Sequence, residues 1–166
     1  MDKARTDIDR LMRQHGSQLL RLCTMLLQDA SEAQDAVQDT FLKAYRHLDS
    51  WRGDATEKTW LTAIAVNVCR DYRRSRWFRC IARERDVADL PEPRTEFVIP
   101  DNTVITEVMR LPDKLREVVL LRYYQNLTQK EIAAALRLSD RAVRQRLQKV
   151  NAILRERLKE WYENEG

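Results

Sequence analysis

Apolar side chains recur every three or four residues over most of the chain, and this spacing predicts amphipathic helices. The first helix is expected over 7–27. The second is expected to begin at Ser31, because Gln34 follows three residues later in a capping-box pattern. Its apolar stripe consists of Ala33, Val37, Phe41, Ala44 and Leu48. The third helix is expected over 59–77. Its core-facing residues are Leu61, Ile64, Ala65, Val68 and Tyr72.

The helical pattern stops after residue 79. The following stretch includes ADLPEPRTEFVIPD, which holds three of the four prolines and is typical of an extended linker. Helices resume near Thr103, with a break at Leu111–Pro112. The expected fold is therefore all-α, with two small helical domains joined by a flexible linker. The domains are expected over 1–79 and 104–166, and the linker over 80–103.

Charge is distributed unevenly along the 166 residues, although the formal net charge is only +4. Four acids and no base lie between Gln28 and Thr40, whereas five arginines and one acid lie between Arg70 and Arg79. A third segment, 137–159, holds eight bases and two acids. Clustered bases indicate a polyanionic partner, and the separate acidic segment indicates a second, basic partner.

The third helix carries a polar stripe opposite its apolar one. Asn67, Arg70, Arg74 and Trp77 fall together on this side. Arginines bind phosphates, an indole can stack on a base, and an amide can recognise a base edge. The loop SWRGDATEK just before the helix adds Trp51 and Arg52. These residues are candidates for nucleic-acid binding. The alternative is a solvated helix face with a tryptophan that packs on a neighbour.

The second basic segment has the pattern of a helix-turn-helix motif. Thr128 and Glu131 form a capping box at the start of a short helix, and Ser139 can cap the long helix that follows. Apolar residues of the long helix pack inward, and polar ones project outward where they can reach a DNA major groove. The projecting residues are Arg141, Arg144, Gln145, Gln148 and Lys149, with Arg146 at the flank. The alternative is a helical hairpin with a solvated basic face.

The acidic second helix offers a surface of a different kind. Glu32, Asp35, Asp39 and Leu42 project away from its apolar stripe. An exposed leucine among acids suggests an interface with a basic, partly apolar protein. The alternative is an ordinary solvated face.

Three segments together resemble the extracytoplasmic-function (ECF, group IV) sigma factors of the sigma-70 family. The segment similar to regions 2.1–2.2 is AQDAVQDTFLKAYRHLDSWRG, at 33–53. The segment similar to regions 2.3–2.4 is KTWLTAIAVNVCRDYRR, at 58–74. The segment similar to region 4 is LPDKLREVVLLRYYQNLTQKEIAAALRLSDRAVRQRL, at 111–147. The resemblance implies a factor that binds core RNA polymerase and directs promoter-specific initiation of transcription.

The resemblance also implies contacts for each surface. Asp35, Gln38, Asp39 and Phe41 match the segment that binds the polymerase clamp helices. The apolar stripe puts Phe41 in the core, so the other three are the expected contacts. Asn67 matches a position that helps to hold a flipped base of the −10 element, and the loop with Trp51 and Arg52 completes that pocket. Positions that meet the −35 element correspond to Arg144, Arg146 and Lys149. An anti-sigma factor is implied as a further partner.

Other functions have less support in the sequence. Cys23, Cys69 and Cys80 show no metal-ligand or disulfide spacing and are expected to be reduced thiols of a cytoplasmic protein. No enzyme motif, cofactor motif or metal constellation is present, and no apolar run approaches the ~20 residues of a membrane span. The main alternative is an autonomous helix-turn-helix regulator, with an N-terminal helical domain for sensing or dimerisation.

Overall fold

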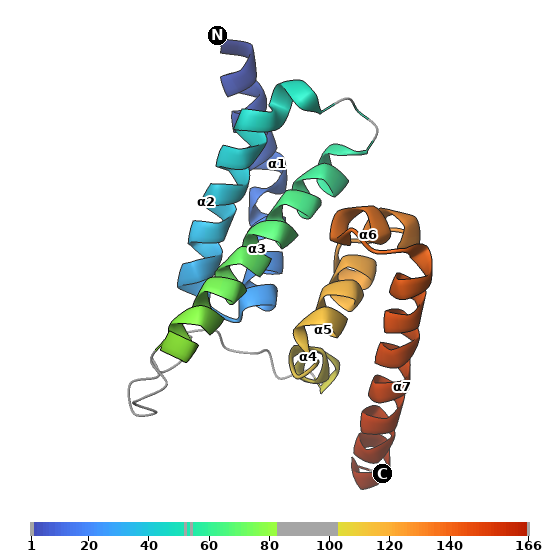
Figure 1. Cartoon of the computed structure of the whole chain (residues 1–166). Coiled ribbons are helices and arrows are strands. Elements are labelled where there is room, and N and C mark those ends of the chain that lie inside the picture. Colours follow the sequence, from blue (N-terminus) through green and yellow to red (C-terminus); the bar gives the residue numbers. More distant parts are fainter. Residues whose placement is uncertain (1, 52, 54, 83–102, 166) are drawn as a thin grey trace. The chain divides into compact units, whose positions relative to one another are not determined.

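The computed structural model describes residues 2–51, 53, 55–82 and 103–165, and none of these lies in a strand. The chain divides into two compact units, Met1–Phe97 and Val98–Gly166. Both units are built from helices (Figure 1), so the predicted all-α class with two helical domains is confirmed. Most of the expected linker lies outside the described residues.

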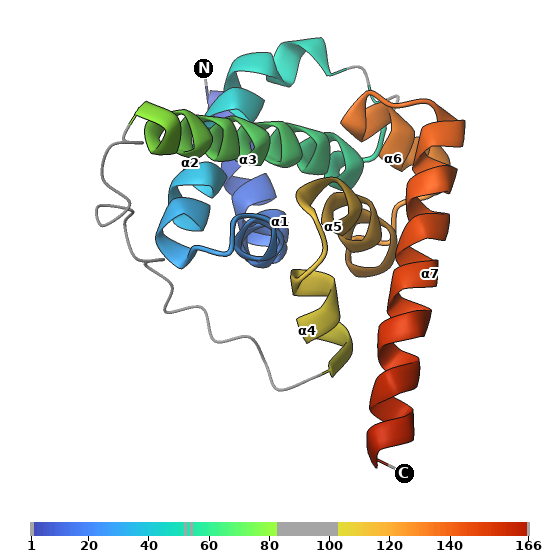
Figure 2. The same ribbon diagram turned by 60° about the horizontal axis from the view of Figure 1, so that its bottom comes forward.

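The first unit is a bundle of three long helices. They are α1 (Asp2–Leu27), α2 (Ala30–His47) and α3 (Glu57–Ala82), with the short 3₁₀ turn η1 (Leu48–Ser50) after α2. Each helix runs antiparallel to the one before it, and α3 lies across the α1–α2 pair (Figures 1 and 2). The fully buried residues of α2 include Ala33, Ala36 and Ala44. Because alanine has a small side chain, α2 can approach its neighbours closely, and apart from Phe41 the larger core residues come from α1 and α3. Those larger residues include Leu11, Leu19, Leu22, Leu26 and Leu61.

The start of α2 differs from the prediction. Asp29, rather than Ser31, is the N-cap, and its Oδ1 accepts a hydrogen bond of 3.0 Å from the backbone N–H of Glu32. The reason is the backbone between α1 and α2. Gln28 has a left-handed conformation (φ 53°), and Asp29 then has the extended conformation that an N-cap requires. Ser31 consequently lies inside the first turn, and the predicted capping box with Gln34 is wrong.

The second unit is built along one long helix, α7 (Asp140–Glu165). Three shorter helices pack against it: α4 (Thr103–Met109), α5 (Asp113–Val119) and α6 (Gln129–Leu136). A π-helical turn, η3 (Leu120–Tyr124), continues from α5. The predicted break at Leu111–Pro112 is confirmed, since it separates α4 from α5. The core of this unit includes Leu121, Leu127, Ile132, Leu136, Val143, Leu147 and Val150.

The helix-turn-helix caps agree with the sequence. The Thr128 side chain accepts from Glu131 N–H, and the Glu131 side chain accepts from Thr128 N–H, which completes the capping box. Ser139 Oγ accepts a hydrogen bond of 3.1 Å from Ala142 N–H at the start of α7. The turn is closed by Arg137 at φ 56°, where glycine would be free of strain. A left-handed arginine costs about 1–2 kcal/mol, which the buried residues on either side of the turn offset.

Candidate functional site

The polar stripe of α3 lies on the side of the helix away from the core. Val68 and Cys69 are buried, whereas Asn67 and Arg70 are half-buried, and Arg74 and Trp77 are exposed. The predicted separation of the two faces is therefore confirmed. Two of the core-facing predictions differ, because Ile64 and Tyr72 are half-buried, whereas Leu61, Ala65 and Val68 are buried as expected.

Two further aromatic and aliphatic residues continue this stripe to the end of α3. Phe78 and Ile81 follow Arg74 by four and seven residues, so they lie on the same side of the helix. The exposed fractions are 59% for Trp77, 57% for Phe78 and 39% for Ile81. The rings of Trp77 and Phe78 meet edge to face, with centroids 5.2 Å apart. The sequence prediction missed Phe78 and Ile81, although their spacing from Arg74 was the available signal.

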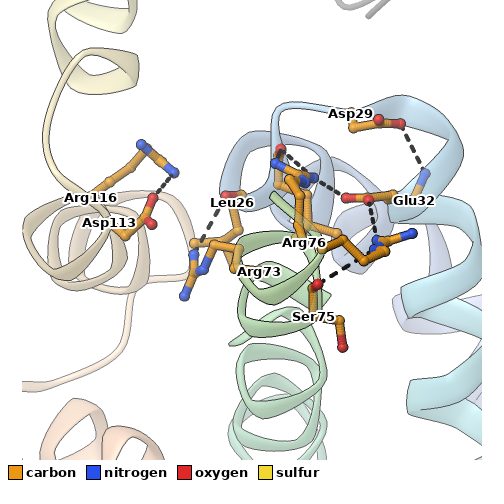
Figure 3. A network of polar contacts seen from close by, with 10 residues as sticks. Leu26, Asp29, Glu32, Arg73, Ser75, Arg76, Asp113 and Arg116 are labelled. Carbon is orange, nitrogen blue, oxygen red and sulfur yellow. Dashed lines mark hydrogen bonds and ion pairs between the residues drawn. The ribbon is translucent and has the colours of Figure 1, made fainter. Parts of the chain in front are cut away.

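Two arginines of the same segment have a structural function. Arg73 donates to the carbonyl of Leu26 (Figure 3). Arg76 donates to the carbonyl of Leu27 at 3.3 Å. These carbonyls lie at the C-terminal end of α1, which carries the negative partial charge of the helix. The guanidinium groups therefore cap α1 from α3.

Glu32 is also part of this structural network. It forms an ion pair with Arg76 (Figure 3). Its Oε1 also lies 3.9 Å from Arg79 Nη2. The side chain of Glu32 is largely buried against α3. Its predicted place on the open acidic surface is therefore wrong, because it neutralises arginines of the bundle.

The remaining acidic surface of α2 is exposed, with one exception. Asp35, Gln38 and Leu42 are exposed, and Phe41 is buried as predicted. Asp39 is half-buried, and its Oδ2 accepts a hydrogen bond of 2.7 Å from the hydroxyl of Tyr72 on α3. Burial, and secondly the bond to Asp39, raises the pKa of Tyr72 well above its ordinary value. The phenol therefore stays neutral and remains a donor at any working pH.

The loop before α3 is organised around Trp51. Its indole stacks on Trp60, with ring centroids 5.2 Å apart and an interplanar angle of 14°. Its Nε1–H donates to the carbonyl of Ala55 at 3.2 Å. Gly53, at φ 79°, allows the chain to turn between them. One face of the Trp51 indole and its N–H group are thus used in contacts that stabilise the loop. Arg52, the other candidate in this loop, lies outside the described residues.

An acidic side chain fixes the start of α3 to α1. Glu57 accepts two hydrogen bonds from Arg10, of 2.7 and 3.1 Å, and its Oε2 lies 3.6 Å from Nε2 of His15. The hydrogen bonding to Arg10 lowers the pKa of Glu57, and the nearby charges add to this effect against the cost of desolvation. Because Glu57 directly follows the loop, this pair also holds the end of the loop.

The outward face of α7 has the predicted composition. Val143, Leu147 and Val150 are buried against the rest of the unit. Arg146 is half-buried, which fits its predicted position at the flank. The exposed residues are Arg141, Arg144, Gln145, Gln148 and Lys149. The motif thus presents donors and acceptors for base edges on one continuous helical surface.

No group of three or more histidine, cysteine, aspartate or glutamate side chains in the described part of the chain could hold a metal ion. None of the described helices has the length and hydropathy needed to cross a membrane. Cys23, Cys69 and Cys80 are free thiols, of which the first two are buried.

Two family models match the chain. Residues 11–79 match sigma-70 region 2, and residues 102–150 match sigma-70 region 4. The region 2 match covers the α2 surface and the polar stripe of α3. The region 4 match covers the helix-turn-helix through the outward face of α7.

Known proteins with similar sequences are sigma factors. The chain is 30% identical over 165 residues to the RNA polymerase sigma-H factor of Pseudomonas aeruginosa, covering 88% of this chain and 82% of that protein. It is 33% identical over 132 residues to the ECF RNA polymerase sigma-E factor of Escherichia coli, covering 71% and 69%.

Solved structures show the same fold. CnrH in complex with the cytosolic domain of CnrY has a TM-score of 0.67 at 26% identity, covering 93% of this chain and 89% of that chain. The sigma factor RpoE of Bartonella quintana, in complex with the anti-sigma factor NepR, has a TM-score of 0.75 at 21% identity, covering 92% and 97%.

The Arg10–Glu57 pair predicts a pH-dependent stability. The pKa of Glu57 is lower in the folded chain than in the unfolded chain. The ionised carboxylate therefore stabilises the fold at pH values above the unfolded-state pKa, and this stabilisation is lost as the pH falls through the folded-state pKa. Glu57→Gln should therefore lower the melting temperature at about pH 7, and its difference from the natural chain should shrink toward about pH 3. Thermal denaturation over this range measures the effect. The control is Asp9→Asn, an exposed acid on α1. A difference that is constant with pH would contradict the assignment.

Proposed function

The chain belongs to the sigma-70 family, in its extracytoplasmic-function group, and we propose that it performs the family's task through three separate surfaces. As a sigma factor it directs RNA polymerase to promoters. The proposal concerns which residues make each contact. Sigma factors are not enzymes as a family, and we propose the cytoplasm, where RNA polymerase acts, as the place of function.

The observation that carries the proposal is the combination of two exposed polar surfaces with two family matches in the same order. The stripe of α3 falls within region 2, and the outward face of α7 falls within region 4. An autonomous helix-turn-helix regulator would account for the second surface alone. It would leave the region 2 match unexplained, so the sigma-factor function is the better supported one.

Each surface is assigned one partner. Asp35, Gln38 and Asp39 on α2 are proposed to bind the clamp helices of core polymerase. On α3, Asn67 is proposed to hold an unstacked base of the −10 element. Its neighbours on the same face, Arg70, Arg74 and Trp77, would contact phosphates and bases. Trp51 is proposed to act by supporting the loop, since its indole is occupied by Trp60 and Ala55.

The outward face of α7 is proposed to bind the −35 element. Arg144, Gln145 and Gln148 have the side chains that recognise guanine and adenine edges, whereas Arg141, Arg146 and Lys149 suit phosphate contacts. Regulation by an anti-sigma factor is part of the proposal. It is supported by the similar chains of CnrH and RpoE, each of which was solved in complex with a second protein.

The direct experiment is transcription in vitro with core RNA polymerase on a library of promoter fragments. The chain should give specific transcripts only when core polymerase is present. Tight and specific binding of the chain alone to duplex DNA, without any polymerase-dependent transcript, would instead support the autonomous regulator.

Reversing one exposed charge on α2 should weaken polymerase binding. Asp35→Lys places a positive charge toward a basic partner, and like charges across an interface are unfavourable. Asp35 is exposed and away from the buried face, so the fold should persist. The matched control is Glu163→Lys on the second unit, where Glu163 is also exposed. Affinity for labelled core polymerase is the measurement, and equal affinity of both variants would refute the proposed surface.

Removing the amide of Asn67 should affect promoter opening. Asn67→Ala should change the free energy of unfolding by about 1 kcal/mol at most, because Asn67 is half-buried and lies outside the core. Discrimination at one −10 position should fall, because the amide offers a paired donor and acceptor. Permanganate footprinting on promoters that differ at single bases measures both effects. Normal opening with an unchanged base preference would leave Asn67 without a function in DNA binding.

Two residues of α7 should differ in their effect on specificity. Arg144→Ala should cost about 1–3 kcal/mol on the preferred promoter and relax one −35 position, as expected for loss of a bidentate base contact. Lys149→Ala should weaken binding to all promoters alike and reduce its salt dependence. Holoenzyme binding to −35 variants at several salt concentrations separates the two. If both variants lose affinity uniformly, Arg144 contacts phosphate rather than a base.

A further inference from the structure

Tyr72 connects the helix of the proposed polymerase surface to the helix of the proposed DNA surface. It lies on α3 between Asp71 and Arg73, and its hydroxyl donates to Oδ2 of Asp39 on α2 at 2.7 Å. Both residues are half-buried. This distance is ordinary for an O–H···O bond and is also compatible with a charged acceptor.

The ion pairs that lie beside Tyr72 on these two helices are weaker. Lys43 on α2 lies 3.9 Å from Asp71, which in turn lies 3.8 Å from Arg74, and all three side chains are substantially exposed. Exposed pairs at such distances contribute little. The Tyr72 hydroxyl is therefore the better-defined restraint on this part of α2.

The choice of a neutral donor matters at this position. The negative charges of Asp39, Asp35 and Glu32 all add to the raised pKa of the Tyr72 hydroxyl, after burial and the hydrogen bond to Asp39. A lysine or arginine here could also hold Asp39, but it would cancel the negative charge that a basic partner recognises. A phenol fixes the carboxylate without this loss. An ionised carboxylate has about four lone-pair sites, so Asp39 keeps the capacity to accept bonds from a partner.

We propose that Tyr72 is a positioning residue for polymerase binding, which holds the Asp39 carboxylate in its binding orientation from α3 while leaving its negative charge intact. The inference rests on the proposed function, because it requires Asp39 to contact polymerase. Preorganisation of this kind strengthens binding by removing part of the cost of ordering a side chain at the interface.

The test is a double-mutant cycle on affinity for core RNA polymerase, measured with labelled full-length chain. Tyr72→Phe removes only the hydroxyl and should weaken binding about three- to tenfold, the usual range for one hydrogen bond. In an Asp39→Ala background, Tyr72→Phe should have no further effect, because the group that it positions is absent. Equal losses in both backgrounds, or no loss in either, would overturn the proposal.

Two further measurements distinguish a positioning function of Tyr72 from an effect on folding and from an effect of charge. Tyr72→Phe should leave the salt dependence of core binding unchanged, because no charge is altered, whereas Asp39→Ala should reduce it. Asp39→Asn retains an acceptor for Tyr72 but loses the charge, and it should bind as weakly as Asp39→Ala. Asp39→Asn binding that equals that of the natural chain would contradict the proposed use of the charge.

The failure of this inference can be distinguished from the failure of the proposed surface. If Asp39→Ala binds normally while Asp35→Lys binds weakly, the α2 surface stands and the function of Tyr72 is refuted. If both bind normally, the α2 surface itself is refuted.

Discussion

The packing of α3 against α1 and α2 determines where the candidate contacts on this helix lie. Its buried face, which includes Leu61, Ala65 and Val68, fixes the rotation of the helix. That rotation in turn brings Asn67 and Arg74 to the outer surface. The same packing lets Tyr72 reach α2. A shift of α3 about its axis would therefore alter the proposed polymerase-binding surface and the proposed DNA-binding surface together.

Both ends of α3 are restrained by charged groups from other helices. At the start of α3, Arg10 of α1 binds Glu57. Near the end of α3, Arg76 donates to the last carbonyl of α1 and also forms an ion pair with Glu32 of α2. Long helices fray at their ends unless such contacts exist. The first contact lies next to the loop, and the second lies next to the exposed Trp77 and Phe78.

Much of the fold could be predicted from the sequence, because it depends on periodicity and on caps that are local in the chain. The three helices of the first unit, the break at Pro112 and the capping box at Thr128 are of this kind. The cap of α2 was predicted wrongly, since both Asp29 and Ser31 are suitable residue types. The choice between them depends on the left-handed Gln28, which a pattern of residue types does not reveal. The π-helical turn η3 likewise has no signature in the apolar spacing.

The candidate site was predicted less completely than the fold. Helical spacing placed Asn67, Arg74 and Arg144 at the surface, because exposure follows from periodicity. Spacing could not show that the partner of Trp51 is Trp60, or that Tyr72 bonds to Asp39. These contacts join residues from different elements. They depend on how the helices pack, and the packing is not encoded in the residues of one helix alone.

The capping of α1 by Arg73 and Arg76 has a consequence for counting charges. The segment 70–79 holds five arginines, and two of them are directed at backbone carbonyls of α1. Bound cations of DNA are displaced only by protein charges that meet phosphates, so the affinity of this segment for a polyanion depends on fewer groups than its composition suggests. At most three arginines remain to release such ions. When some of the basic residues stabilise the ends of neighbouring helices, the number of basic residues in a segment overestimates the number of phosphates that it can neutralise.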